Sequence, residues 1–405
     1  MKLYGFILFL IISNCIIAQN DVERLLSYPL SDREMSEVLA REEFLNTHKF
    51  NSPWLRDLDF RIRSNDKEVG LEDYRLRFTL LNPVEMDRNR DYRKLLLSQQ
   101  SFERKKTIND VMLRRYELLI ESHFLEQNFK IKEKYLLNLK DIRSIVMAEL
   151  FDLGDVVNLE QEMTRIEFQL ADLKQKSDII GRLLSSYELE NFPDWSQFPI
   201  ISIQQISFML KNNMNDSVSM RVIAKNQKLE ESSSIMAIKK AESFSNIGYF
   251  QAEYDKERGN VWDEHVGFQI GITIPIFNSN KPDLQRRELE LLEDAVDLNQ
   301  TISVEKEQND LEVVRINDLI SQGDLIKEKI NSLNDLKKLI NETDSDINGF
   351  KRIADYDLFL NEKQISTFSD IRMRFVKLLH TYGRLADQPY TNFLSNDLTT
   401  FDISQ

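Results

Sequence analysis

The placement of proline constrains this chain more than any other feature. No proline lies between Pro83 and Pro193, and none lies between Pro282 and Pro389. Both stretches are rich in Leu, Glu, Lys, Gln and Ile, which favour helices, whereas proline is excluded from helix interiors. Each stretch is therefore predicted to be helical over most of its length.

Apolar residues recur in both stretches at a spacing typical of helices that pack together. Steps of three and four residues produce an apolar stripe close to the 3.5-residue period of coiled coils. The stripe consists of Ile131, Tyr135, Leu139, Ile142 and Val146 in the first stretch, and of Ile326, Ile330, Leu333 and Ile340 in the second.

One glycine in each stretch marks a predicted turn. Gly154 follows Pro83 at nearly the same distance as Gly349 follows Pro282. Each stretch is therefore predicted to be a long helix, a tight tip and a return helix. At 1.5 Å per residue the outgoing helix would be on the order of 100 Å long, far longer than an ordinary globular core needs.

Segments with strict alternation of apolar and polar residues precede each helical stretch. Such alternation predicts half-buried β-strands, and the segments 64–70 and 256–262 would join them into two hairpins. The alternating apolar residues are Leu58, Phe60 and Ile62; Tyr74, Leu76, Phe78 and Leu80; Phe250, Ala252 and Tyr254; and every second residue from Val266 to Ile276.

The two halves of the chain align at a constant offset. Tyr74 maps onto Ile270 and Pro193 onto Pro389 when 196 is added, which indicates an internal duplication. Each repeat is a strand pair followed by a helical hairpin. The expected fold class is mainly α with a small β part. An amphipathic helix at about 217–242 precedes the second strand pair, and a shorter segment at 31–48 precedes the first.

These features predict the following organisation. Residues 1–18 form a signal peptide, 19–52 an N-terminal periplasmic helical segment, 53–82 a first β-hairpin, and 83–192 a first helical hairpin with its tip near 154. Residues 193–244 form a linker and an equatorial helix, 245–281 a second β-hairpin, 282–388 a second helical hairpin with its tip near 349, and 389–405 a C-terminal tail.

The N-terminus predicts export. Lys2 is followed by a short apolar run, and cleavage is expected between Ala18 and Gln19. A membrane anchor is the weaker alternative, because a spanning helix needs about 20 apolar residues. Lipidation at Cys15 is a second alternative. Cys15 is the only cysteine, so after cleavage at Ala18 the mature chain could form no disulfide and no cysteine metal site.

Composition and motifs argue against enzymes and nucleic-acid binders. The formal net charge is −14, whereas phosphate binding needs clustered Lys and Arg. The four histidines are scattered, and the sequence contains no glycine-rich phosphate loop and no G-x-S-x-G motif. We therefore expect a protein without catalytic residues, cofactor or metal.

The four predicted strands have the length and alternation of outer-membrane strands. Four strands cannot close a barrel, but three chains would supply twelve. The polar residues Arg61, Arg63, Arg75 and Arg77 would then face the lumen. The alternation alone equally fits a small sheet in a soluble periplasmic coiled-coil protein.

The segment from Val266 to Asn278, VGFQIGITIPIFN, followed by a Leu-, Arg- and Glu-rich helix, resembles the last barrel strand of the TolC-like outer-membrane efflux and secretion channels. The segment from Met214 to Met220 and the helix after it resemble the approach to that family's third strand. The resemblance implies a homotrimer, a twelve-stranded barrel in outer-membrane lipid and a periplasmic α-barrel. It also implies a periplasmic adaptor protein and an inner-membrane transporter as partners in efflux or type I secretion.

The chain departs from the family in one respect, since the segment before its first strand is shorter than the usual helix there. Two alternatives to a channel therefore stay open. One is a periplasmic coiled-coil scaffold or adaptor, and the other is a degenerate homologue without channel activity.

In that family, polar links between the two helical hairpins close the periplasmic tip. The resemblance implies a gate in which Lys351 or Arg352 pairs with Glu160 while Asp355 lines an acidic ring. The alternative is that these are ordinary solvated helix charges, which contribute about 0–1 kcal/mol as exposed pairs.

Overall fold

The computed structural model describes residues 22–48, 54–64, 72–148, 153–187, 200–213, 218–243, 247–256, 264–272, 281–340 and 347–403. The predicted signal peptide with Cys15, and the first residues of the predicted linker, 193–199, lie outside these residues. The chain divides into two compact units, each assembled from distant segments. The helical unit comprises 1–35, 105–220 and 306–405, and the strand unit comprises 36–104 and 221–305.

The long proline-free stretches are helical, as predicted. Helix α3 (Pro83–Ala148) has 66 residues and α7 (Lys281–Ile340) has 60. Proline fits at the start of both because the first N–H groups of a helix have no partner within it. The Asn82 side chain caps α3 by accepting a 3.0 Å hydrogen bond from the Val84 amide. At 1.5 Å per residue, α3 is about 100 Å long.

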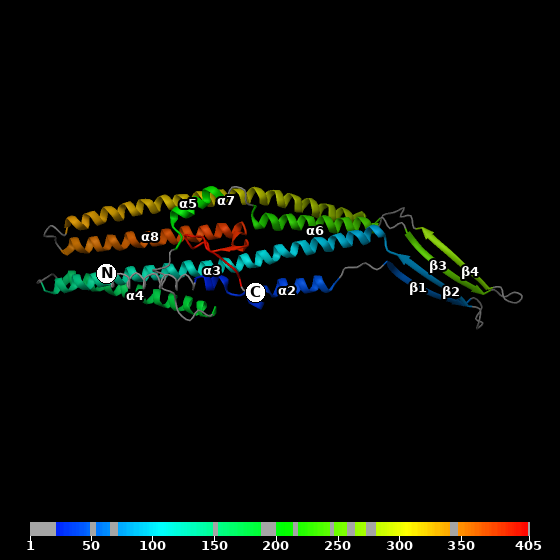
Figure 1. Ribbon diagram of the computed structural model, residues 1–405, viewed down its shortest axis with the longest axis horizontal. Coiled ribbons are helices and arrows are strands. Elements are labelled where there is room, and N and C mark those ends of the chain that lie inside the picture. Colours follow the sequence, from blue (N-terminus) through cyan, green and yellow to red (C-terminus); the bar gives the residue numbers. More distant parts are fainter. Residues whose placement is uncertain are drawn as a thin grey trace, which may run out of the picture. The chain divides into compact units, whose positions relative to one another are not determined.

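Each long helix is followed by a return helix that runs antiparallel to it (Figure 1). Helix α4 (Leu153–Ser185) returns along α3, and α8 (Ile347–Thr381) returns along α7. Gly154 and Gly349 lie in the first turn of the return helices rather than between the helices. The segments that connect the paired helices, 149–152 and 341–346, lie outside the described residues, and so do the predicted turns. A side chain at Gly349 would meet nothing within 4 Å, so no close packing requires glycine there.

Two apolar clusters hold the helical unit together. The larger cluster joins Met112 and Tyr116 of α3 to Ile206 of α5 (Ile203–Asn213) and to Phe375 of α8. The smaller cluster contains Tyr135 and Leu139 of the predicted stripe, packed against α4 and α8. Both clusters join α3 to α8 across more than 200 residues of sequence.

Both ends of the described chain pack into the larger cluster. Arg115, which is fully buried on α3, donates hydrogen bonds to the carbonyls of Leu26 (2.9 Å), Tyr28 (2.8 Å) and Pro29 (3.3 Å). The Tyr116 hydroxyl donates to the carbonyl of Thr391 at 2.8 Å, in β5 (Tyr390–Thr391), which pairs with β6 (Thr400–Phe401). A short 3-10 helix, η2 (Arg384–Ala386), links α8 to these strands.

The strand unit contains a four-stranded antiparallel sheet in the order β1-β2-β3-β4 (Figure 1). The strands are β1 (Leu55–Ser64), β2 (Glu72–Leu80), β3 (Ile247–Lys256) and β4 (Glu264–Ile272). Both predicted hairpins are confirmed, and pairing of β2 with β3 joins them into one sheet. The predicted last residues of the fourth strand, 273–276, lie outside the described residues. The order strand, strand, long helix, return helix occurs twice along the chain, as the predicted duplication requires.

The two amphipathic helices also form. Helix α2 (Asp32–Thr47) precedes the first strand pair, and α6 (Met220–Ser243) precedes the second. Within the strand unit, α6 is held to α7 by Lys228–Asp294 and Lys225–Asp297 ion pairs, both at 2.6 Å. None of the described helices is long and apolar enough to cross a membrane.

Candidate functional site: the strand sheet and the hairpin ends

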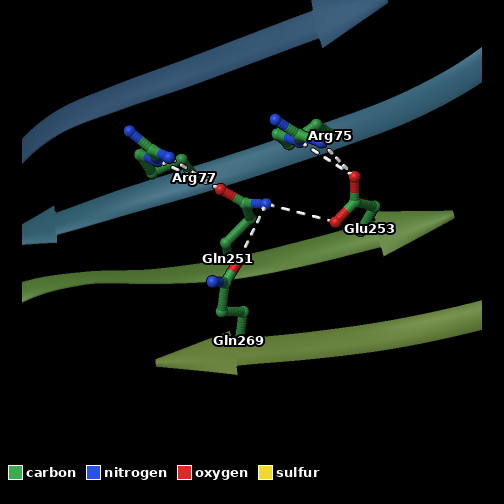
Figure 2. Close-up of polar contacts among 5 residues, drawn as sticks. All are labelled: Arg75, Arg77, Gln251, Glu253 and Gln269. Carbon is green, nitrogen blue, oxygen red and sulfur yellow. Dashed lines mark hydrogen bonds and ion pairs between the residues drawn. The ribbon is translucent and has the colours of Figure 1, made fainter. Parts of the chain in front are cut away.

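One face of the sheet carries a ladder of polar side chains (Figure 2). Arg75 of β2 forms an ion pair with Glu253 of β3. Arg77 donates two hydrogen bonds, of 3.1 and 3.0 Å, to the Gln251 side-chain oxygen. The Gln251 amide in turn donates to Glu253 at 3.3 Å and to Gln269 of β4 at 3.4 Å. The ladder therefore crosses three strands and ties the two hairpins together.

All four predicted lumen arginines lie on this polar face. Arg61 is the register partner of Arg75, and Arg63 is the register partner of Asp73. Directly opposed residues in an antiparallel pair share one face of the sheet. Arg61 and Arg75 are like charges in opposed positions, and each is neutralised by its own carboxylate, Asp59 for Arg61 and Glu253 for Arg75.

An aromatic contact fills the remaining space on the polar face. The Arg77 guanidinium lies 3.8 Å from the centre of the Tyr249 ring, which is a cation–π geometry. The same ring occupies the place that a side chain at Gly271 would take, so that position requires glycine.

The opposite face of the sheet is apolar and open. Its exposed side chains include Phe268, at 83% exposure, and Ile270, at 67%. Monomeric soluble proteins rarely expose a contiguous apolar surface of this kind. The residues that share it are Leu58, Phe60, Ile62, Tyr74, Phe250, Val266, Phe268 and Ile270.

In the helical unit, the predicted gate acid Glu160 has an ion-pair partner within its own hairpin. Glu160 of α4 pairs with Arg143 of α3 at 2.5 Å, within the first hairpin. Among the described residues of the chain, no ion pair joins Glu160 to Lys351 or Arg352. The antiparallel register of α3 and α4 brings positions 143 and 160 together, and this register depends on the turn between the helices.

The structure instead links the two hairpins through residues that the sequence analysis did not select. Tyr135 of α3 donates a hydrogen bond from its hydroxyl to Asp355 of α8. Lys132 forms an ion pair with Glu362 of α8 and donates a 2.8 Å hydrogen bond to Gln169 of α4. The predicted acid Asp355 thus takes part in an inter-hairpin contact, with a tyrosine as its partner. Tyr135 was identified only as an apolar stripe position, and no pattern in the sequence marks it as a donor.

The surroundings of Tyr135 keep its hydroxyl protonated, so that it can donate to Asp355. Burial, followed by the hydrogen bond to Asp355, raises the pKa of the Tyr135 hydroxyl far above its usual value. A hydrogen bond from Arg165 lowers the pKa of Glu162, burial opposes that change, and the charge of Lys351 lowers the pKa further. Lys351 therefore acts on Glu162, an acid of the first hairpin.

Comparisons with known proteins show a shared fold. No protein-family model and no curated protein matches the sequence. The structure of the outer membrane protein VceC from Vibrio cholerae matches with a TM-score of 0.65 at 11% identity, over 91% of this chain and 96% of that one. The open state of the Neisseria gonorrhoeae MtrE outer membrane channel matches with a TM-score of 0.60 at 12% identity, over 95% and 91%.

The Campylobacter jejuni CmeC outer membrane channel matches with a TM-score of 0.60 at 10% identity, over 94% of this chain and 86% of that one. Each match spans both the helical hairpins and the strands, since it covers nearly the whole chain. The chain therefore has the fold of the TolC-like outer-membrane channel proteins.

Proposed function

We propose that this protein is one subunit of a trimeric outer-membrane conduit through which cargo leaves the periplasm. The observation that carries the proposal is the two-faced sheet, with an exposed apolar surface on one side and the Arg75–Glu253 and Arg77–Gln251 ladder on the other. Lipid would cover the apolar face, and water would solvate the polar face. The fold shared with outer-membrane channels supports the same function.

The strand order supports oligomerisation. Strands β1 and β4 are the edges of the sheet, and their outer backbone groups need partners inside lipid. Pairing β1 of one copy with β4 of the next would close a barrel, and three copies would supply twelve strands. The four arginines Arg61, Arg63, Arg75 and Arg77 would then line the lumen.

The helical hairpins would extend from the barrel into the periplasm. Their tips are the surfaces that we assign to a periplasmic adaptor, which would connect the conduit to an inner-membrane transporter. Export through a cleavable signal peptide at 1–18 belongs to the same proposal. The protein would supply a passive duct, with no catalytic step of its own.

The contacts between hairpins suggest how the tip is held closed. In this proposal the Tyr135–Asp355 hydrogen bond and the Lys132–Glu362 ion pair restrain α8 against α3. The glycines Gly154 and Gly349, in the first turns of α4 and α8, would lie next to the moving ends. Opening would require the inter-hairpin contacts to break.

A matched pair of variants on neighbouring residues of β4 tests the assignment of the two faces. Lysine at a lipid-facing position near the bilayer centre costs about 2–4 kcal/mol. We therefore expect Ile270→Lys to reduce the amount of heat-modifiable trimer recovered from the outer membrane, and Gln269→Lys to leave it unchanged. Equal recovery of both variants, or a soluble periplasmic monomer or dimer in the parent protein, would favour a coiled-coil scaffold instead.

A further inference from the structure

A polar cavity of about 200 Å³ lies between α3 and α8 in the helical unit. Three of the polar residues that line it are on α8, namely Gln364, Ser369 and Arg372. His123 and Gln127 face them from α3. The residues that line the cavity include no aspartate and no glutamate. Ile120, Phe124, Ile365 and Phe368 complete the lining, so polar and apolar side chains share it.

Arg372 carries a positive charge at this cavity, and no carboxylate among the described residues forms an ion pair with it. The residue is 9% exposed, and its hydrogen bonds among the described residues are two long ones, both 3.4 Å, to the Ile201 carbonyl. By contrast, Arg374 on the same helix pairs with Glu312 at 2.6 Å. Burial alone lowers the pKa of Arg372, to about 10, so the guanidinium still carries its proton at neutral pH.

Arg372 lines the cavity and has more donors than its two contacts with Ile201 use. A guanidinium has five N–H donors in a planar fork, and two of its nitrogens contact Ile201. Within the described part of the chain, each nitrogen of Arg372 either has a hydrogen-bond partner or is accessible to solvent. Nε of Arg115, in contrast, is buried without a partner there. Arg372 therefore presents unused donors to a space that is large enough for a small solute. Such a fork is the geometry that binds carboxylate and phosphate groups.

His123 adds a neutral donor rather than a second charge. Burial, together with the positive charges of Arg372 and Lys130, lowers the pKa of His123 to about 4. At neutral pH the lining thus has one net positive charge, surrounded by the amide groups of Gln127 and Gln364 and the hydroxyl of Ser369. This set matches one anionic group with several acceptor oxygens.

We propose that the cavity between α3 and α8 binds a small oxyanion, the carboxylate or phosphate group of a solute, with Arg372 as its anchor and the side chains of His123, Gln127, Gln364 and Ser369 as neutral hydrogen-bonding groups. The bound anion would bridge the two helical hairpins, because its contacts come from both α3 and α8. Binding would thereby stabilise the packing of one hairpin on the other.

The test is calorimetric titration of the full-length protein, in the oligomeric form in which it is purified, with sodium phosphate and with sodium malonate. Sodium chloride at matched ionic strength is the reference. We expect saturable binding of one anion per chain and a rise in the thermal unfolding midpoint. The stronger of the two ligands identifies the source of the oxyanion as a phosphate or a carboxylate compound.

Variants connect binding to the cavity. Arg372→Gln is expected to weaken binding at least tenfold, whereas Arg374→Gln, two residues further along α8 and paired with Glu312, is expected to leave it unchanged. If Arg372→Gln does not fold, the double variant Gln127→Leu/Gln364→Leu keeps the charge and removes two hydrogen-bonding groups, with an expected loss of at least fivefold.

Absence of saturable binding beyond the chloride reference would overturn the proposal. Binding that Arg372→Gln or the double glutamine variant leaves intact would also overturn it. Neither measurement depends on conduction or on membrane insertion, so failure of this site and failure of the proposed channel function are distinguishable.

Discussion

The hydroxyl of Tyr135 on α3 donates a hydrogen bond to the carboxylate of Asp355 on α8, 220 residues further along the chain. Tyr135 is itself 4% exposed within an apolar cluster that α3, α4 and α8 share. The contact therefore anchors a polar link between the hairpins on a packed aromatic ring. Because the pKa of Tyr135 is raised, the hydroxyl remains a donor throughout the physiological pH range.

Removal of this hydroxyl should loosen the hairpins without disturbing the cluster. Tyr135→Phe keeps the ring, so we expect a trimer of normal abundance with more frequent opening in single-channel recordings. Asp355→Asn should have a similar but smaller effect, because an amide oxygen still accepts a hydrogen bond. Tyr356→Phe is the control, since Tyr356 stacks on Phe359 and is 42% exposed. Equal opening of the parent and the Tyr135→Phe channel would exclude this contact as a restraint.

The Lys132–Glu362 ion pair should contribute more to stability than surface pairs do. The Lys132 side chain is only 12% exposed, and Lys132→Met leaves Glu362 without its counter-charge. We expect a loss of about 1–3 kcal/mol in unfolding free energy. Lys338→Met, which breaks the exposed i,i+3 pair with Asp335, should cost less than about 1 kcal/mol. Chemical denaturation of both variants measures the difference in unfolding free energy. Equal losses would contradict a larger contribution from the Lys132–Glu362 pair.

A double-mutant cycle separates the observed partner of Glu160 from the one that family resemblance implied. Glu160 and Arg143 are each nearly half exposed, so their coupling energy should be about 0.2–1 kcal/mol. The coupling between Glu160 and Lys351 should be close to zero within one chain. A larger coupling to Lys351 in the assembled protein would show that the pairing forms between subunits.

Neutralisation of Glu253 should change the ion selectivity of the proposed lumen. Glu253→Gln removes the carboxylate that balances Arg75, so the polar face gains one net positive charge per chain. We expect the reversal potential in a potassium chloride gradient to shift toward anion selectivity. Asp335 lies on α7 in the helical unit, outside the sheet, and Asp335→Asn is a suitable control. An unchanged reversal potential in Glu253→Gln would place the ladder away from the conduction path.

Burial of His123 predicts a loss of stability in acid. Its pKa is about 4 in the folded chain and 6.5 in the reference state, so between these values the unfolded chain binds more protons. Stability from this group is therefore full above about pH 6.5 and falls as the pH drops toward 4, by roughly 3 kcal/mol in total. His123→Leu should flatten the pH dependence of the unfolding midpoint in that window. The measurements belong in chloride buffers without oxyanions.

The features that the sequence predicted well are those set by local periodicity. Pro83 and Pro282 marked the beginnings of α3 and α7, and Leu139 and Leu333 of the predicted stripes are buried. Alternation likewise placed Arg75 and Arg77 on one face of β2. A period of two or 3.5 residues decides which side of an element a residue occupies, whatever the element packs against.

Partners between elements could not be predicted in the same way. Arg143 meets Glu160 because of the register of α3 on α4, and a shift of one helical turn would select a different pair. Arg372, which has no ion-pair partner among the described residues, has no sequence signature that sets it apart from Arg374, which pairs with a carboxylate two residues later. Tertiary packing alone decides which of the two arginines faces a cavity.

Planar-bilayer recording of the protein purified from outer membranes tests the channel assignment most directly. The account predicts a trimer with small single-channel conductance, which rises when Tyr135→Phe and Lys132→Met are combined. A soluble species, or a membrane trimer that stays silent even in the combined variant, would contradict it.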